Sequence, residues 1–347
     1  MHMADALLSP AVGGAMWAAT AGTIALASRR LKRDLDDSTI PLMGVLGAFV
    51  FAAQMINFTI PGTGSSGHLG GGMILAILLG PWAGFLTMAS VLTVQALFFA
   101  DGGLLALGCN IFNLGVFPCF VAYPLIYRPL AGATPSRNRI LAGSVAASVI
   151  GLQLGAFSVV LETFCSGMSE LPFAAFALLM EPIHLAIGLV EGLITAAVVG
   201  FIWKARPETL GVSPAVSAPS LRRVLTGLAL AAVIAGGGLS WFASERPDGL
   251  EWAVLHAAGT ENPGGGEQES PGVFADLQAR IAVLPDYGFR DRSEYRGDGR
   301  PATSSAWPAA DAGTSLAGLL GGGLTLLFAT GAGLLLRWRR RASAEHC

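Results

Sequence analysis

Long apolar stretches separated by short polar segments run through the whole chain. A helix needs about 20 apolar residues to cross the hydrocarbon core of a membrane. In the first part of the chain, such stretches predict spanning helices over residues 10–28, 40–58, 70–79, 82–100, 103–127, 140–164 and 173–203. Residues 70–100 are divided at Gly80-Pro81, and the shorter half can cross only if neighbouring helices shield it. The pattern therefore predicts an all-α polytopic membrane protein that begins with a seven-helix bundle.

Two further apolar stretches, residues 224–243 and 315–336, predict an eighth and a ninth span. A Pro/Ser/Ala-rich segment precedes them and indicates a domain boundary. We therefore divide the chain into a seven-helix module (1–206), a linker (207–223) and a two-helix module (224–341). The polar residues 244–313 form a predicted loop between the last two helices, and its GTENPGGGEQESPG segment has the composition of a disordered linker.

Basic clusters predict the orientation, because Lys and Arg gather at the cytoplasmic ends of spanning helices. They follow the first, fifth, seventh and ninth spans, at Arg29–Arg33, Arg128–Arg139, Lys204–Arg206 and Arg337–Arg341. All four fall on one side if the N-terminus is outside and the C-terminus is cytoplasmic. No positive region precedes the first apolar stretch, so it reads as a retained helix and not a cleaved signal peptide. The expected location is the inner or plasma membrane.

The composition agrees with a membrane protein and argues against a soluble enzyme. Hydrophobic residues make up 53% of the 347 residues and charged residues 13%, against about a quarter in soluble chains. The net charge of -2 and the lack of a basic stripe give no indication of nucleic-acid binding. The four cysteines have no CxxC spacing, and the chain contains no Walker A pattern, so ATP hydrolysis is not expected of it.

Candidate chemistry lies in the first two residues. The Met1 amine, the His2 amide nitrogen and the His2 imidazole together can close a five-membered and a six-membered chelate ring around one metal ion. A deprotonated amide favours a metal that prefers planar nitrogen ligation, such as Ni(II) or Cu(II), with Co(II) possible. His68, in a glycine-rich loop predicted on the same side of the membrane, is a candidate fourth ligand. In the alternative interpretation, His2 occurs at this position by chance and His68 is only a solvated loop residue.

The sequence resembles a known transporter family at these residues. MHMADALLSP, GTGSSGHLGGGMILAILLGPWAG and VQALFFADGGLLALGCNIFNLG look like the CbiM/NikM family over about residues 1–205. This family comprises the substrate-capture components of energy-coupling-factor (ECF) ABC transporters for cobalt and nickel. The resemblance implies a seven-helix subunit whose metal is bound by Met1, His2 and His68. The metal is then transported substrate and not a resident cofactor, and nickel versus cobalt stays open.

The second module is similar to the two-helix CbiN/NikN-like partner subunit. The similarity rests on Pro247–Glu251, which read PDGLE, and on the helix–loop–helix layout. The resemblance implies a coupling subunit and ATPase subunits on separate chains, with the lipid membrane around them and no nucleic acid.

Polar and small residues within the predicted helices add further candidates. We expect four polar residues either to orient the metal-binding segments by hydrogen bonds or only to pack helices: Gln95, Asp101, Asn110 and Asn113. Asp5 either caps the N-terminal segment, which we favour, or accepts from a ligand amide. A small-residue row, Gly44, Ala48 and Ala52, is a candidate docking surface for the coupling subunit, with ordinary packing as the alternative. The alternative function is an intramembrane metalloenzyme that uses Glu181, His184 and Glu191, for which we prefer structural or gating roles.

Overall fold

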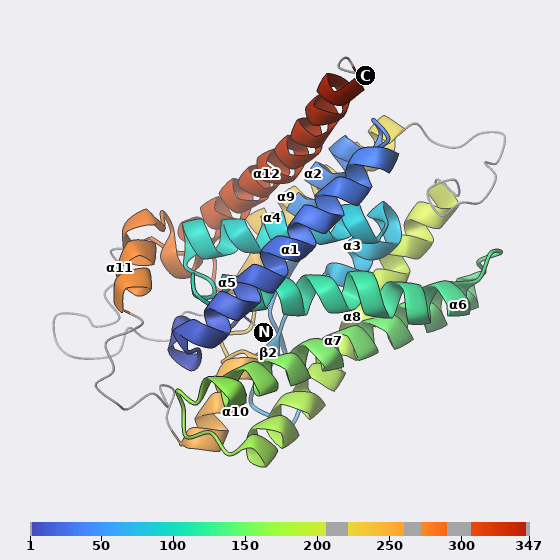
Figure 1. The fold of residues 1–347 in the computed structure, drawn as a ribbon. Helices are drawn as coiled ribbons and strands as arrows, with labels where there is room; N and C mark the ends of the chain where they lie inside the picture. Colours follow the sequence, from blue (N-terminus) through green and yellow to red (C-terminus); the bar gives the residue numbers. More distant parts are fainter. Residues whose placement is uncertain (1, 206–220, 260–271, 290–306, 345–347) are drawn as a thin grey trace.

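The computed structural model describes residues 2–205, 221–259, 272–289 and 307–344, and nearly all of them are helical (Figure 1). After a short turn η1 (Asp5–Leu7), the first module contains α1 (Pro10–Asp34), α2 (Thr39–Gln54), α3 (Gly72–Leu79), α4 (Pro81–Phe99), α5 (Leu107–Ile111), the π-helical η2 (Phe112–Tyr127), α6 (Arg128–Ala131), α7 (Arg137–Ser166) and α8 (Phe173–Ala205). Segments α5, η2 and α6 follow one another without a break. The predicted all-α membrane fold is confirmed.

The two helices predicted from residues 70–100 are present and separate. Gly80 lies between them with φ +77°, a left-handed value that glycine adopts without strain, and Pro81 opens the next helix. The eight residues of α3 rise only about 12 Å, so this helix alone cannot cross a bilayer. Six of the described helices are long and apolar enough to do so, and α2 is a shorter apolar helix.

The second module is more helical than its sequence pattern predicts. It contains α9 (Leu221–Gly237), η4 (Leu239–Phe242), α10 (Gly249–Ala258), α11 (Gly272–Ile281), η5 (Pro285–Tyr287) and α12 (Ala312–Ala344). The predicted loop 244–313 thus holds α10, α11 and η5. A capping box explains the start of α10, since Asp248 Oδ1 accepts from the Glu251 N–H and Glu251 Oε2 accepts from the Asp248 N–H. Residues 260–271, which make up nearly all of the segment with linker composition, and most of the 207–223 linker lie outside the described residues.

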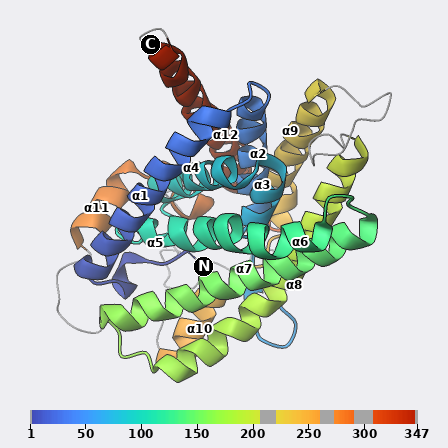
Figure 2. The same cartoon turned by 45° about the vertical axis from the view of Figure 1, so that its right-hand side comes forward.

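The two modules pack together along α2, which lies beside α9 and α12 (Figure 2). A Cβ atom added to Gly44 would lie 3.1 Å from the Leu326 carbonyl oxygen of α12, and Ala52 packs against Ala232 and Ala235 of α9. Gly44, Ala48 and Ala52 are all buried. The prediction that this row is a docking surface for another subunit is therefore wrong, because the chain's own second module covers it.

We expect Gly44→Leu to lower the free energy of unfolding by about 1–3 kcal/mol, because the added side chain must displace Thr330 and Leu326. Gly323→Leu is the matched control, since Gly323 is an exposed residue of α12 with no atom within 4 Å of an added Cβ. Thermal unfolding of the detergent-solubilised protein measures both. Equal stability of the two variants would contradict the close contact between modules.

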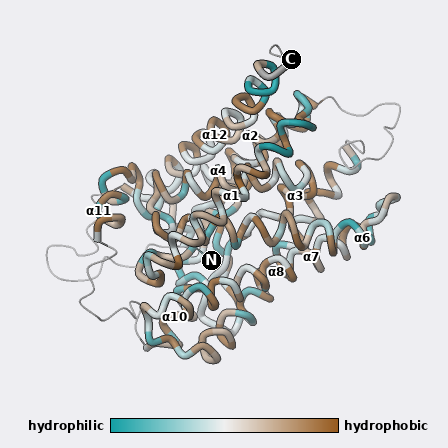
Figure 3. Tube along the Cα trace, viewed as in Figure 1, coloured by the Kyte–Doolittle hydropathy of each residue, from teal (hydrophilic) through white to brown (hydrophobic). Residues whose placement is uncertain are grey.

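Charged residues gather at one end of the bundle. Figure 3 shows hydrophilic residues at the C-terminal ends of α1 and α12, with hydrophobic residues along the helices between. The two ends meet there: Arg340 donates to the Leu35 carbonyl oxygen at 2.6 Å, and Arg337 forms an ion pair with Asp37 at 3.1 Å. The basic clusters that follow the first and ninth predicted spans therefore lie on the same side of the protein.

Candidate metal centre

The N-terminal segment is held inside the protein by backbone hydrogen bonds at Met3. The Met3 N–H donates to Asn110 Oδ1 at 2.8 Å, and the Met3 carbonyl oxygen accepts from the Gly103 N–H at 2.8 Å. The Met3 side chain is fully buried. These contacts fix the position of His2, the residue just before them. Asn110, predicted as a supporting residue, thus contacts the segment directly.

Asp5 fixes the same segment at a second point. Its Oδ1 accepts from the Ala106 N–H at 2.9 Å, just before α5 begins. The favoured prediction, a cap on the N-terminal segment itself, is wrong, because the turn at Asp5–Leu7 has no side-chain cap. Asp5 instead joins this segment to the turn after α4.

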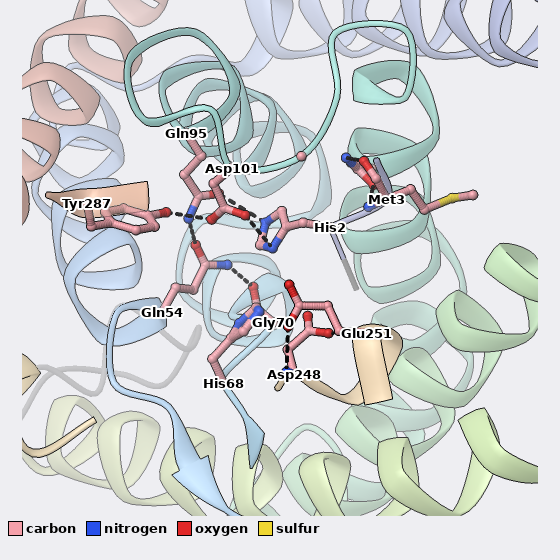
Figure 4. A network of polar contacts seen from close by, with 12 residues as sticks. His2, Met3, Gln54, His68, Gly70, Gln95, Asp101, Asp248, Glu251 and Tyr287 are labelled. Atoms are coloured by element: carbon pink, nitrogen blue, oxygen red, sulfur yellow. Dashed lines mark hydrogen bonds and ion pairs between the residues drawn. The ribbon is translucent and has the colours of Figure 1, made fainter. Parts of the chain in front are cut away.

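The His2 ring faces two polar side chains, Gln95 of α4 and Asp101 just after this helix (Figure 4). His2 Nε2 lies 3.2 Å from Gln95 Oε1, and His2 Nδ1 lies 3.5 Å from Asp101 Oδ1. The His2 side chain is only 6% exposed. Both predicted supporting residues, Gln95 and Asp101, therefore contact His2.

A chain of hydrogen bonds assigns the proton on the His2 ring. The Gly70 carbonyl oxygen can only accept, so Gln54 donates to it through Nε2 at 2.8 Å. Gln54 Oε1 then accepts from Gln95 Nε2 at 2.9 Å, which leaves Gln95 Oε1 as an acceptor toward His2. His2 Nε2 must therefore donate, and Nδ1 of the neutral ring is unprotonated. Nδ1 is the nitrogen that closes a six-membered chelate ring with the His2 amide.

His68 lies against His2, with ring centroids 5.2 Å apart and an interplanar angle of 23°. It follows a two-stranded hairpin, β1 (Phe58–Thr59) and β2 (Ser66–Gly67). His68 Nδ1 contacts the Leu69 carbonyl oxygen at 3.0 Å, so it carries the proton and leaves Nε2 as the donor atom. Because metal–imidazole bonds are about 2 Å long, one ion beside the rings can bind both.

Both imidazoles are neutral at physiological pH. Burial lowers the pKa of His2 below its usual value and lowers that of His68 to about 4. A neutral imidazole is the form that binds a metal ion, so neither ring has to lose a proton first.

The loop that carries His68 is fixed from α8 by Glu191. Glu191 is 1% exposed, and its Oε2 accepts from the Gly70 N–H at 2.7 Å. Gly71 follows with φ +78°, and a Cβ atom there would lie 2.4 Å from Val50 Cγ1. The remaining residues of the alternative site do not join Glu191: His184 Nδ1 contacts the Met180 carbonyl oxygen, and Glu181 Oε1 has no partner in the described structure. Glu191 thus contributes to the position of His68.

The second module forms one wall of the site. The Ser66 N–H donates to the Pro247 carbonyl oxygen at 2.8 Å, and the Ser244 N–H donates to that of Asn57 at 2.8 Å. The PDGLE segment therefore runs along the hairpin that precedes His68. Although burial raises the pKa of Asp248, nearby positive charge and the Glu251 N–H lower it to about 2, so this side chain is a carboxylate.

These elements surround a cavity of about 750 Å³ that is lined by His2 and His68. Of the described residues lining it, six are acidic: Asp5, Asp101, Glu245, Asp248, Glu251 and Asp286. Arg246 is the one arginine among them, and no lysine is present. The arrangement attracts cations and presents two neutral imidazoles to them.

Asn113 is a predicted supporting residue that does not line this cavity. Asn113 donates to Glu162 Oε2 at 2.9 Å within the bundle, so the packing interpretation fits it better than a supporting role. Met1 lies outside the described residues. Within the described ranges, no group of three His, Cys, Asp or Glu side chains is placed to hold a metal ion.

Four further residues line the site: Gln54, Asp248, Glu251 and Tyr287. Sequence analysis identified Asp248 and Glu251 only as part of the PDGLE motif, and Gln54 and Tyr287 not at all. The spacing of Asp248 and Glu251 is a capping-box signal that indicates the start of α10. Gln54 and Tyr287 carry no local signal, because their partners come from distant parts of the chain.

Family models match both modules. The model described as "Cobalt uptake substrate-specific transmembrane region", CbiM, matches residues 2–209, and the PDGLE domain matches residues 222–338. The fused nickel transport protein NikMN of Rhodobacter capsulatus is 33% identical over 83% of this chain and 88% of its own length. The cobalt transport protein CbiM of Geobacter sulfurreducens is 31% identical over 80% of this chain and 82% of its own.

A solved structure is similar to the first module. The crystal structure of a truncated transition metal transporter superposes with a TM-score of 0.51 at 31% identity, and the match covers 59% of this chain and 99% of that one. The arrangement of the first module is therefore found in a transition metal transporter.

Proposed function

The chain belongs to the CbiM family of cobalt uptake substrate-specific transmembrane regions, fused here to a CbiN-like PDGLE module, and from this we propose that it captures Ni²⁺ or Co²⁺ for import by an ECF-type ABC transporter. It is a multi-pass membrane protein of metal transport and not an enzyme.

The contact between His2 and His68 carries the proposal. The N-terminal segment and a distant loop bring the imidazoles of His2 and His68 to a centroid distance of 5.2 Å in an acidic cavity. We propose that the metal is bound by the Met1 amine, the deprotonated His2 amide, His2 Nδ1 and His68 Nε2. Four nitrogen ligands favour a planar geometry, which suits Ni(II), and Co(II) is the second candidate.

The charge distribution supports an orientation with the cavity outside. The basic ends of α1 and α12 belong at the cytoplasmic face, and the cavity lies at the opposite end of α1. In this orientation, acidic residues face the external medium and raise the local concentration of divalent cations.

The coupling subunit and the ATPase subunits are proposed to be separate chains, because this chain has no Walker A pattern.

Because the second module covers the small-residue row on α2, we consider α1 as the surface that contacts the coupling subunit. Its exposed small residues follow one face of the helix at spacings of three and four: Ala11, Ala15, Ala18, Gly22 and Ala25. Such a row permits close approach of a helix from another subunit. We propose α1 as the docking surface for the coupling subunit.

Calorimetric titration with Ni²⁺ and Co²⁺ tests the ligand set through its pH dependence. Because His68 has a pKa of about 4 and that of His2 is also lowered, protons released near pH 7 must come from the amide and the amine. We therefore expect one to two protons to be released per metal. The affinity should weaken by at least about tenfold for each unit that the pH falls below 7. Measurements in buffers of different ionisation enthalpy count these protons, and binding without proton release would contradict amide ligation.

A further inference from the structure

A segment of the second module, Gln278–Tyr287, lies along the C-terminal end of α4, and we call it the strap. Gln278 Nε2 donates to the carbonyl oxygens of Ala96 at 2.9 Å and Gly102 at 2.7 Å. The Val283 and Leu284 N–H groups both donate to the Phe98 carbonyl oxygen, at 3.0 and 3.1 Å. The last carbonyl groups of a helix have no partner within it, so the strap supplies donors to groups that need them. It is thereby fixed to the segment that carries Asp101.

Tyr287, at the end of the strap, reaches the metal-binding region through Asp101. Its hydroxyl donates to Asp101 Oδ2 at 2.5 Å, and its ring stacks on Phe99 with centroids 5.0 Å apart. Burial and the Asp101 charge raise the pKa of Tyr287 well above its usual value, so the phenol stays a donor. Figure 4 shows Tyr287 and His2 approaching Asp101 from opposite sides. The other oxygen, Oδ1, faces His2 Nδ1 at 3.5 Å.

Backbone strain gathers at this junction. Three non-glycine residues of the described chain have positive φ: Ala100 (56°), Asp286 (50°) and Tyr287 (59°). Ala100 precedes Asp101, and the other two lie at the end of the strap. Left-handed conformations of ordinary residues persist where surrounding contacts impose them, often at functional sites. The strain thus independently marks the meeting of Asp101 and Tyr287.

We infer that Tyr287 is a positioning residue for metal capture, which holds the Asp101 carboxylate against the metal-binding nitrogen of His2. The inference rests on the proposed function. Asp101 Oδ1 and His2 Nδ1 both act as acceptors, and a cation bound at Nδ1 is stabilised by a carboxylate fixed beside it. Without the phenol, the partly exposed Asp101 side chain can rotate into the cavity. The second module thereby contributes to metal affinity without supplying a ligand.

Tyr287→Phe is the direct test, because it keeps the ring on Phe99 and removes only the hydroxyl. In the full chain with an authentic N-terminus, we expect affinity for NiCl₂ to fall about tenfold or more and release to a chelator to accelerate by a similar factor. The ligand-field absorption of bound Ni²⁺ should stay unchanged, since Tyr287 is not a ligand. Tyr123→Phe, in η2, is the matched control and should show neither effect.

A double-mutant cycle tests whether Tyr287 acts through Asp101. Asp101→Asn alone should weaken binding, and adding Tyr287→Phe to it should change the affinity less than about twofold. Equal losses in both backgrounds, a shifted absorption band, or unchanged affinity and release in Tyr287→Phe would each overturn the inference. Where Tyr287→Phe lowers the unfolding temperature, Gln278→Ala provides a second variant that frees the strap without removing the phenol. Gln278→Ala should accelerate the release of bound Ni²⁺ to a chelator, and an unchanged release rate would overturn the role of the strap.

His68→Ala separates this inference from the proposed function. If His68→Ala keeps full affinity, the proposed site itself is wrong. If it loses affinity while Tyr287→Phe does not, only the role of Tyr287 fails.

Discussion

A chain with one extra residue before Met1 is expected to bind Ni²⁺ and Co²⁺ on the order of 1000-fold more weakly than the authentic chain, which corresponds to about 4 kcal/mol. The extension converts the Met1 amine into an amide and moves the new amine out of the five-membered chelate ring. The segment cannot slide to compensate, because Met3 is bound to Asn110 and Gly103, and Asp5 is bound to Ala106. One of the four proposed nitrogen ligands is therefore lost.

The measurement is calorimetric titration of the detergent-solubilised protein, together with metal uptake by cells that express the partner subunits. A chain with the same residue added after its last position is the control and should bind normally. Undiminished affinity in the N-terminally extended chain would remove the terminal amine from the ligand set, and with it the proposed chelate.

Replacement of His68 by Ala is expected to weaken metal binding by about 100-fold or more, because the imidazole is one of the four proposed ligands. The fold should tolerate the change. The His68 ring contacts the His2 ring and the neighbouring Leu69 carbonyl oxygen, while the hairpin before it is held by Ser66 and Pro247.

Titration with Ni²⁺ and thermal unfolding of His68→Ala distinguish a lost ligand from a lost fold. His256→Ala is the matched control, since His256 stacks on Trp252 of α10 and does not line the cavity. We expect that control to keep its affinity. Weak binding by both variants would indicate a general effect of removing imidazoles near the PDGLE segment.

The apolar stretches predicted most of the helices, because a membrane-spanning helix has a length and a composition that few other structures share. The helices α10 and α11 were not predicted, since short amphipathic helices within a polar segment lack that signal. The small-residue row on α2 was correctly seen as a surface for close helix contact. Such a row shows that another helix can approach, but not which helix does, and here α9 and α12 of the same chain cover it.

The sequence predicts the site residues that carry a local signal, and it does not predict the contacts between residues that are distant in sequence. His2 stands out because an imidazole at position 2 can chelate together with the chain terminus, and His68 stands out in its glycine-rich loop. The contacts of Gln54 with Gln95 and of Tyr287 with Asp101 join residues 41 and 186 positions apart. No periodicity or motif relates residues so far apart. The first pairing follows from the packing of α2 against α4 within the first module, and the second from the packing of the two modules.

The contact between Asp101 and Tyr287 also bears on how the protein is made. Synthesis proceeds from the N-terminus, so His2 and His68 exist long before the residue that completes their surroundings, 186 positions beyond Asp101. A nascent chain that has reached only the end of α8 already carries both imidazoles but lacks the strap and the PDGLE wall. The surroundings of His2 and His68 can therefore be complete only after residue 287 has been made, and a chain that ends at α8 lacks the hydroxyl that donates to Asp101.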